Sequence, residues 1–370
     1  MSTYNIALVP GDGIGHETLQ EGIKVLKAVE QCVSGISFNM EKYNAGAGCY
    51  QKTGEVLPSS TFKGCKDADA IFWGSAGIPG VVYPDGTEVG VEAGLRMRFD
   101  LDLYANVRPI KLYPNVCSRI SGIKECGIDY ILVRENTEGL YAGRGGGNVI
   151  HGSIATDTMV ISRMGTERVS RVAFELSAGR KGAPLDGKRR VTCIDKANIL
   201  RSWSFFRKVF DDTSVNYPNI EKDYAYADAM ACWMILKPEF YDVCVTENMI
   251  GDILTDLGAA TVGGMGMSPS AELGDNNGLF QGSHGSAPTI AGKNIANPTA
   301  TIVSGRMMLD WLADRSKNEN LRKAAEIIER SVEETFKMQI FTQDLGGKAS
   351  TSEFGDAVVS NMFSVAKAIL

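Results

Sequence analysis

The sequence has few of the residues and patterns that several protein classes require. It contains three histidines, and its eight cysteines include no C-x-x-C pair, so neither a zinc site nor a disulfide framework is indicated. The formal net charge of −6 leaves no basic excess for nucleic-acid phosphates. No apolar run is long enough to span a membrane, and the N-terminal stretch has no charged-then-apolar leader. We expect a cytoplasmic protein with reduced core cysteines that binds neither nucleic acid nor membranes.

Short apolar runs alternate with helical patterns along the 370 residues, a length sufficient for two domains. This alternation predicts an α/β fold with a largely parallel sheet. The predicted strands are 4–10, 36–43, 67–74, 128–134, 156–162, 189–196 and 241–246. A glycine turn at 11–15 has the spacing G-x-G-x-G, whereas a Rossmann turn needs G-x-G-x-x-G. We therefore interpret it as a place where backbone approaches another segment closely.

Two aspartates, Asp252 and Asp256, lie one turn apart on a predicted helix whose cap is expected at Glu247–Asn248. A solvated acidic face is one interpretation, because most acids are exposed. The other is a divalent-cation site, because a cation would relieve the repulsion of two acids beside apolar neighbours. The remaining polar residues of the chain favour the cation.

Three arginines lie beside apolar stretches. Arg98 and Arg108 flank one such stretch, and Arg134 ends a predicted strand. Ligands of open α/β sheets collect at the carboxyl ends of strands, and arginine holds carboxylates through two hydrogen bonds. One arginine would be explained by a surface ion pair, but three together favour a polyanionic small substrate.

Lys196 ends another apolar strand, and Asp228 lies at the start of a helix. The ordinary interpretations are a solvated lysine and a helix N-cap, and a general base is the alternative for Lys196. Further along, the Gly/Ser-rich loop 283–298 offers backbone N–H groups that can cradle phosphates.

Six motifs extend these observations over nearly the whole chain, namely RFDLDLYANVRP, VRENTEGLYAG, DKANIL, YADAM, VTENMIGDILTDLGA and HGSAPTIAGKNIANP. Together they resemble the β-decarboxylating dehydrogenases, which comprise isocitrate, 3-isopropylmalate, homoisocitrate and tartrate/D-malate dehydrogenases. The resemblance implies two α/β domains and not a Rossmann fold. Residues 1–103 and 257–370 would form a large cofactor-side domain, and 104–256 a small domain. A β-arm at about 140–164 would pair with a second subunit in a homodimer.

The resemblance also implies roles for matching residues. Arg98, Arg108 and Arg134 would hold the carboxylates of a small polycarboxylate substrate. Asp252 and Asp256 would bind Mg²⁺ or Mn²⁺ together with Asp228 of the partner subunit. Lys196 of the partner subunit would help to deprotonate the C2 hydroxyl, and Tyr141 would protonate the enolate carbon after CO₂ leaves. The NAD(P) contacts would be His284, Gly285, Ser286, Ala287, Thr289 and Asn297.

The implied reaction is metal- and NAD(P)-dependent oxidative decarboxylation of a 2-hydroxy acid with a β-carboxylate. Thr289 stands where NAD-dependent members commonly have aspartate and an NADP-dependent type has lysine. The DLGG motif supplies no Tyr/Arg pair for a 2′-phosphate, so NAD is favoured and NADP stays possible.

The segment from Glu92 to Met97 matches neither the Ser/Asn pair of isocitrate enzymes nor the twin leucines of isopropylmalate enzymes. We expect isocitrate or a close tricarboxylate first, then 3-isopropylmalate, then D-malate, tartrate or homoisocitrate. The alternative class, a non-catalytic regulatory subunit, predicts a damaged Lys/Tyr/Asp set, and here that set is intact.

Overall fold

Strand β1 (Ser2–Gly11) lies between two parallel neighbours, β2 (Ile36–Lys42) and β3 (Ala70–Ser75), which bury its apolar residues. The computed structural model describes residues 2–370. The chain divides into two compact units: unit 1 contains the residues up to Leu101 with Tyr113–Cys117 and Gly263–Leu370, and unit 2 contains Asp102–Leu112 and Ser118–Val262. Each unit has its own strands and helices, so the two are described separately.

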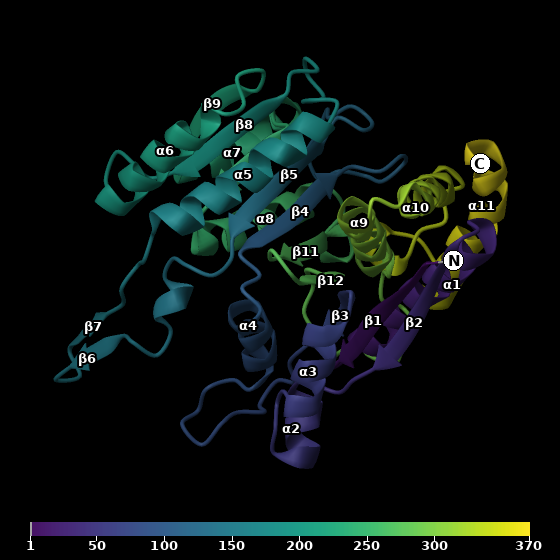
Figure 1. Cartoon of the computed structure of the whole chain (residues 1–370), viewed down its shortest axis with the longest axis horizontal. Coiled ribbons are helices and arrows are strands. Elements are labelled where there is room, and N and C mark those ends of the chain that lie inside the picture. The colour runs from purple at the N-terminus through teal and green to yellow at the C-terminus, as the bar shows by residue number, and fades with distance from the viewer. Residues whose placement is uncertain (1) are drawn as a thin grey trace. The chain divides into compact units, whose positions relative to one another are not determined.

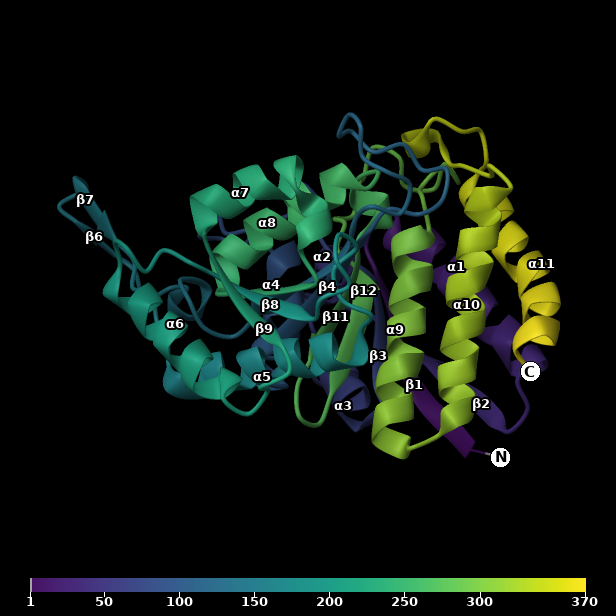
Figure 2. The same ribbon diagram turned by 90° about the horizontal axis from the view of Figure 1, so that it is seen from above.

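The strands of unit 1 follow the order β2-β1-β3-β12-β11, all parallel except β11, which is antiparallel to β12. Helix α9 packs on β11 and β12 and lies beside α1 and beside α10 (Figure 1), and Figure 2 shows α11 on the far side of α10. The other elements are α1 (Gly15–Cys32), α2 (Ala47–Thr53), α3 (Ser59–Asp67), α4 (Gly90–Asp100), η3 (Met265–Met267), β11 (Pro269–Leu273), β12 (Gly278–Gly282), α9 (Thr299–Ser316), α10 (Glu319–Lys337), η4 (Gln343–Leu345) and α11 (Thr351–Ile369).

The strands of unit 2 follow the order β4-β5-β10-β8-β9, all parallel except the antiparallel pair β4 and β5. Figure 2 shows α7 and α8 on one side of these strands and α5 and α6 on the other. The elements are β4 (Ala105–Lys111), β5 (Asp129–Glu135), η1 (Tyr141–Gly143), β6 (Asn148–Ile150), β7 (Ile154–Thr156), α5 (Arg163–Gly179), β8 (Arg190–Asp195), α6 (Arg201–Ser214), β9 (Glu221–Tyr226), α7 (Ala227–Leu236), η2 (Pro238–Phe240), β10 (Val243–Thr246) and α8 (Asn248–Thr261).

The short antiparallel pair β6 and β7 extends from unit 2 as an arm in both views. Its side chains are exposed, including Val149 at 69% and Ile154 at 55%. A hairpin with apolar side chains and no layer packed over it is unstable alone, so this arm is suited to pairing with another surface.

Three sequence-based expectations need correction. The strand predicted at 156–162 is wrong, because only Thr156 belongs to a strand and Val160 makes an isolated bridge with Gly139. The boundary predicted after residue 256 would cut α8, whereas unit 2 keeps this helix whole to Val262. Of the cysteines predicted to be in the core, Cys117, Cys126 and Cys232 are exposed.

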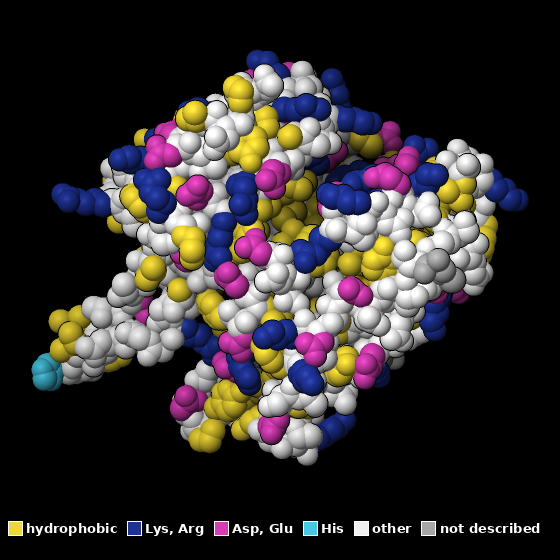
Figure 3. Space-filling view, in the orientation of Figure 1, with side chains coloured by type: hydrophobic (Ala, Val, Ile, Leu, Met, Phe, Trp, Pro, Cys, Tyr) yellow, Lys and Arg dark blue, Asp and Glu magenta, His cyan; other side chains and the backbone are white. Residues whose placement is uncertain are grey.

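The surface carries charges of both signs. In Figure 3, Lys and Arg side chains are interspersed with Asp and Glu over the face shown, and the net charge of the whole chain is −6. No helix within residues 2–370 is long and apolar enough to cross a membrane.

Candidate active site

Helix α8 begins with the cap that its sequence predicted. The carboxylate of Glu247 accepts hydrogen bonds from the backbone N–H groups of Met249 and Ile250, at 3.1 and 2.8 Å. Burial raises the pKa of Glu247, and these N–H donors oppose that shift. The cap directs the helix so that Asp252 and Asp256 follow one turn apart, Asp252 partly exposed and Asp256 exposed.

Arg108 on β4 lies beside both aspartates. Its Nη2 is 3.7 Å from Asp252 Oδ1, and its Nη1 is 3.6 Å from Asp256 Oδ1. Nη1 also donates to Thr255 Oγ1 at 2.6 Å, and Nε donates to Asn106 Oδ1 at 3.3 Å. Because the arginine is buried, these contacts hold its guanidinium plane in one orientation.

Arg134, in β5, is 2% exposed and is held by the first residue of α8. Its Nε and Nη2 donate to Asn248 Oδ1 at 2.9 and 2.8 Å, and its Nη1 donates to Asp252. The amide of Asn248 donates in turn to the Glu138 carbonyl at 2.8 Å. Sequence reasoning considered Asn248 only as a helix cap and did not predict its bond to Arg134.

Tyr141 from η1 completes this cluster. Its hydroxyl donates to Asp252 Oδ2 at 3.1 Å, and its ring centre is 5.6 Å from Arg134 Cζ. Burial, followed by the charge of Asp252, raises the pKa of Tyr141. A phenol is protonated at neutral pH even without this shift, so the hydroxyl can act as a proton donor.

Lys196 and Asp228 form a separate pair in unit 2. Lys196 Nζ donates to Asp228 Oδ1 at 2.6 Å, and this hydrogen bond lowers the pKa of Asp228. The N-cap interpretation of Asp228 is wrong, because the N-cap of α7 is Tyr226. The ring of Tyr226 lies 5.8 Å from Lys196 Nζ. A hydrogen bond thus links a candidate base, Lys196, to a candidate metal ligand, Asp228.

The acid pair on α8 fits a hard divalent cation in the chemistry of its donors, since Mg²⁺ and Mn²⁺ take carboxylate oxygens. Burial raises the pKa of Asp256; Arg108 opposes the shift, and the neighbouring charge of Asp252 adds to it. A cation would remove this electrostatic cost. Within residues 2–370, no three His, Cys, Asp or Glu side chains come together as metal ligands. Asp252 and Asp256 are thus a pair of carboxylates, not a set of three, within the described residues.

Arg98, the third predicted arginine, lies in the last turn of α4 in unit 1. Its Nε and Nη2 donate to Glu272 Oε2 and Oε1 at 3.2 and 2.9 Å. The amide of Gln281 donates to the same Glu272 Oε1 at 3.1 Å. Neither Glu272 nor Gln281 was predicted from the sequence, because their strands β11 and β12 were not predicted either.

The Gly/Ser-rich loop 283–298 contacts the glycine turn that follows β1. The Ile14 N–H donates to the Ser286 carbonyl at 2.9 Å. A Cβ built on Gly13, whose φ is 55°, would lie 2.0 Å from that carbonyl oxygen. The prediction of a close backbone approach at this turn is confirmed. Ala287 has φ 39°, a strained value for a residue with a side chain.

The other predicted cofactor contacts lie along the same loop. His284 Nδ1 is 3.0 Å from the Gly285 carbonyl, and Thr289 is exposed. Asn297 donates through Nδ2 to Asp344 Oδ2 at 3.0 Å, which places a carboxylate of the DLGG motif beside it.

The structure thus brings predicted residues together in two groups. The first is in unit 2 and consists of Arg108, Arg134, Tyr141, Asp252 and Asp256. The second, also in unit 2, is the pair Lys196 and Asp228. The remaining predicted residues, Arg98 and the loop from His284 to Asn297, both belong to unit 1.

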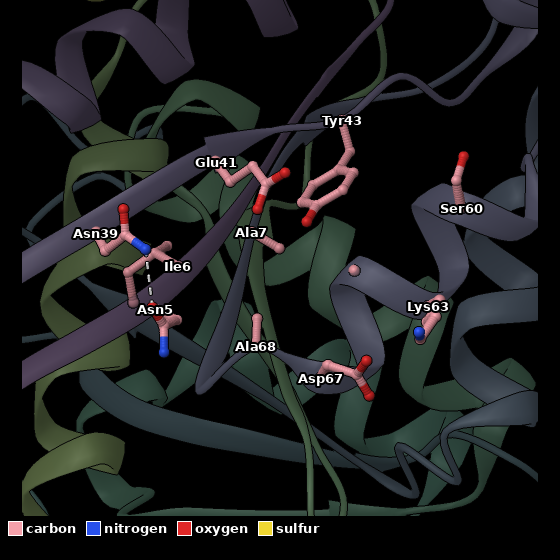
Figure 4. A pocket seen from close by; sticks show the side chains of 11 residues that line it. Asn5, Ile6, Ala7, Asn39, Glu41, Tyr43, Ser60, Lys63, Asp67 and Ala68 are labelled. Atoms are coloured by element: carbon pink, nitrogen blue, oxygen red, sulfur yellow. Dashed lines mark hydrogen bonds between the residues drawn. The ribbon is translucent and has the colours of Figure 1, made fainter.

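A cavity of about 370 Å³ in unit 1 contains none of these residues. Figure 4 shows its lining from β1, β2 and α3, with Glu41, Tyr43 and Asp67 around it. Asn39 donates to Asn5 at 2.9 Å at its edge. Its mixed acidic, basic and neutral lining does not indicate one ligand.

Comparison with known proteins gives concordant results. The model of the isocitrate/isopropylmalate dehydrogenase family matches residues 5–358. A 3-isopropylmalate/3-methylmalate dehydrogenase of Methanocaldococcus jannaschii is 40% identical over 97% of this chain and 99% of its own. A 3-isopropylmalate dehydrogenase of Thermotoga maritima is 40% identical over 96% and 98% of the two chains.

Among solved structures, isocitrate dehydrogenase from Methylococcus capsulatus superposes with a TM-score of 0.83 at 33% identity, over 97% of this chain and 99% of that one. The matched fold agrees with the predicted α/β, non-Rossmann architecture. The chain therefore belongs to the isocitrate/isopropylmalate dehydrogenase family and is an NAD(P)-dependent β-decarboxylating dehydrogenase.

Proposed function

We propose that this enzyme oxidatively decarboxylates a malate with an apolar substituent at C3, of the 3-isopropylmalate type, using NAD and Mg²⁺ or Mn²⁺. This reverses the order expected from the sequence, which placed isocitrate first. The relatives named above, two of which act on 3-isopropylmalate, support the alternative.

The observation that carries the substrate class is the face of α4 that bears Arg98. Val91, Leu95 and Arg98 have the spacing i, i+4, i+7 and so share one helix face. Val91 is 50% exposed and Leu95 is partly exposed, although neither gains from contact with water. An apolar substituent beside Arg98 would cover these side chains. This burial would contribute about 25 cal/mol of binding free energy per Å² of apolar surface removed from water.

The arginines would bind the carboxylates that flank the reacting carbons. The buried Arg108 and Arg134 are oriented by Thr255, Asn106 and Asn248, so little side-chain entropy remains to be lost on binding. Asp252 and Asp256 would hold the metal with Asp228 of the partner subunit. When bound, the metal supplies a Lewis acid that stabilises negative charge on the C2 oxygen.

Two groups of the chain would move protons. The neutral form of Lys196, after its Nζ has given up one proton to solvent, would accept the C2 hydroxyl proton as the nicotinamide takes the hydride. Because Lys196 is 2.6 Å from Asp228, the base and the third carboxylate would arrive together from the partner subunit. After loss of CO₂, Tyr141 would donate its hydroxyl proton to C3, since a phenol keeps its proton at neutral pH.

We further propose a homodimer and a preference for NAD. The exposed apolar arm β6–β7 and the incomplete metal site both support a second copy. Asp344 Oδ2 lies 3.0 Å from Asn297 Nδ2, so a carboxylate stands beside a predicted adenosine contact and would repel a 2′-phosphate.

The test is a substrate panel with purified enzyme and Mg²⁺ or Mn²⁺, in which NADH and NADPH formation are followed separately. The panel contains 3-isopropylmalate, 3-methylmalate, isocitrate, homoisocitrate, D-malate and tartrate. We expect the highest kcat/KM with a 3-alkylmalate and NAD. A higher kcat/KM with isocitrate or homoisocitrate would contradict the proposed substrate class.

A further inference from the structure

Asp195, the last residue of β8, is a buried aspartate directly before Lys196. Its carboxylate accepts two hydrogen bonds from the guanidinium of Arg207 on α6, at 2.6 Å from Nε to Oδ2 and 2.9 Å from Nη2 to Oδ1. Oδ1 also accepts from the backbone N–H of Ala197 at 2.8 Å. The carboxylate thus fixes the main chain on both sides of Lys196, because it belongs to the residue before and binds the residue after.

The same guanidinium lies beside the end of the neighbouring strand β9. Its Cζ is 5.0 Å from the ring centre of Tyr224 and 5.3 Å from that of Tyr226, distances at which arginine interacts favourably with aromatic rings. Tyr226 pairs with Asp195 in the register of β8 and β9, and Asp228 follows it by two residues in the first turn of α7. One arginine therefore lies beside both strand ends from which Lys196 and Asp228 extend.

Burial separates this ion pair from the pair that it supports. The side chain of Asp195 is 0% exposed and that of Arg207 is 28% exposed, and two parallel N–H···O bonds fix the plane of the guanidinium. Lys196 and Asp228 share one hydrogen bond, and their side chains are 31% and 71% exposed. An ion pair this open holds its side chains weakly, so their placement depends on the strand ends behind them.

We propose that Asp195 and Arg207 are positioning residues for the reaction, which hold the ends of β8 and β9 so that Lys196 and Asp228 stay aligned with each other. This inference rests on the proposed function, because it takes Lys196 as the base and Asp228 as the third metal ligand. The effect reaches the substrate only through those two side chains. A misplacement of about 1 Å by a distant change can lower a rate by about 10²-fold.

Unit 2 contains a matched ion pair at the opposite edge of the same strands. Asp242 is 0% exposed and directly precedes β10, which is parallel to β8. Its carboxylate accepts from Arg180 Nε at 2.7 Å and from Ser177 Oγ at 2.6 Å. Removing the charge of Asp242 or of Asp195 leaves an arginine without its buried partner and should destabilise unit 2 in both cases. Only Asp195 lies at the carboxyl edge, beside Lys196.

The test compares the wild-type enzyme with Asp195→Asn and with the control Asp242→Asn, each of which keeps the side-chain shape and removes the charge. The kcat for the best substrate of the panel is measured at saturating NAD and Mn²⁺, at a temperature where all three proteins are folded. We expect kcat to fall by about 10- to 100-fold in Asp195→Asn and by less than about twofold in Asp242→Asn, although both variants melt earlier.

A second measurement reports on Lys196 without turnover. Acetic anhydride acetylates lysines in the enzyme free of metal and substrate, and mass spectrometry gives the rate at Lys196 relative to Lys24, which is paired with Glu21 and Asp356 in unit 1. We expect labelling of Lys196 to be about threefold faster in Asp195→Asn, because Nζ is held less by Asp228, and unchanged in the control.

A second pair of variants covers the case in which Asp195→Asn does not fold. Arg207→Lys keeps the positive charge and one hydrogen bond to Asp195 but lacks the planar fork that lies beside the two tyrosine rings. It should lower kcat and expose Lys196 to labelling in the same direction. Its control, Arg180→Lys, should change neither.

Equal losses of kcat in Asp195→Asn and Asp242→Asn would overturn the inference, since general destabilisation would then explain both. A fall in kcat with no change in the labelling of Lys196 would overturn it as well. Failure of the proposed function gives a different result, namely a wild-type enzyme that turns over no member of the panel. The labelling rates would then still test whether Asp195 and Arg207 position Lys196.

Discussion

Asn248→Ala should lower the stability of unit 2 and weaken the binding of the substrate. The side chain is fully buried, and its Oδ1 accepts two hydrogen bonds from the Arg134 guanidinium at 2.9 and 2.8 Å. A hydrogen bond to a charged group contributes about 1.5–3 kcal/mol, and two that share one oxygen contribute less than twice that. Losing the bond to the Glu138 carbonyl adds about 1 kcal/mol.

The expected total is about 3 kcal/mol in the free energy of unfolding. If the 370 residues unfold together, this lowers the melting temperature by about 4 °C. The matched control is Asn219→Ala, an exposed asparagine of the same unit, with an expected change below about 0.5 kcal/mol. Denaturant unfolding and calorimetry measure both variants.

The same change should raise KM for the substrate by about tenfold, because Arg134 loses the acceptor that orients its Nε and Nη2. It should leave the affinity for NAD unchanged, since Asn248 is in unit 2 and the predicted cofactor loop is in unit 1. If Asn248→Ala unfolds like Asn219→Ala and keeps the wild-type KM, the account of Arg134 is refuted.

Three further predictions concern single side chains. Tyr141→Phe should lower kcat by about 10²–10⁴ through loss of the proton donor and leave substrate binding in calorimetry nearly unchanged. Asp256→Asn should weaken Mn²⁺ binding at least about tenfold, and equal affinity in a titration would argue against its role as a ligand. Burial raises the pKa of Cys65 to about 12, so the unfolded thiol ionises first and stability falls by about 2–3 kcal/mol between pH 9 and 11. Cys65→Ala should lack this part of the alkaline loss, and an identical pH profile would contradict it.

Local signals predicted strands β1, β2, β3, β5, β8 and β10, because burial and hydrogen bonding there agreed with the local pattern. The apolar run before Glu247 and its capping carboxylate gave β10 and α8. Two of the strands that were not predicted shape the surroundings of Arg98. Strands β11 and β12 carry glycine, serine and proline in PSAEL and GLFQG, and they become strands only because they pair with each other and β12 with β3.

The substrate class proposed above was also not the one that the sequence placed first. The segment before Arg98 matched no specificity pattern as a string of residues, and isocitrate was ranked first. Helix α4 begins at Gly90, and it turns Val91 and Leu95 onto the face of Arg98.

What the sequence determined by itself was the placement of the candidate residues: two carboxylates one helical turn apart, three arginines beside apolar runs and a lysine at the end of one. Helical periodicity and strand ends are local properties, so spacing alone could establish them. Only the tertiary structure decided which partner each arginine takes. Asn248, Thr255 and Glu272 lie 114, 147 and 174 residues from the arginines they contact, and the order of the strands brings them together.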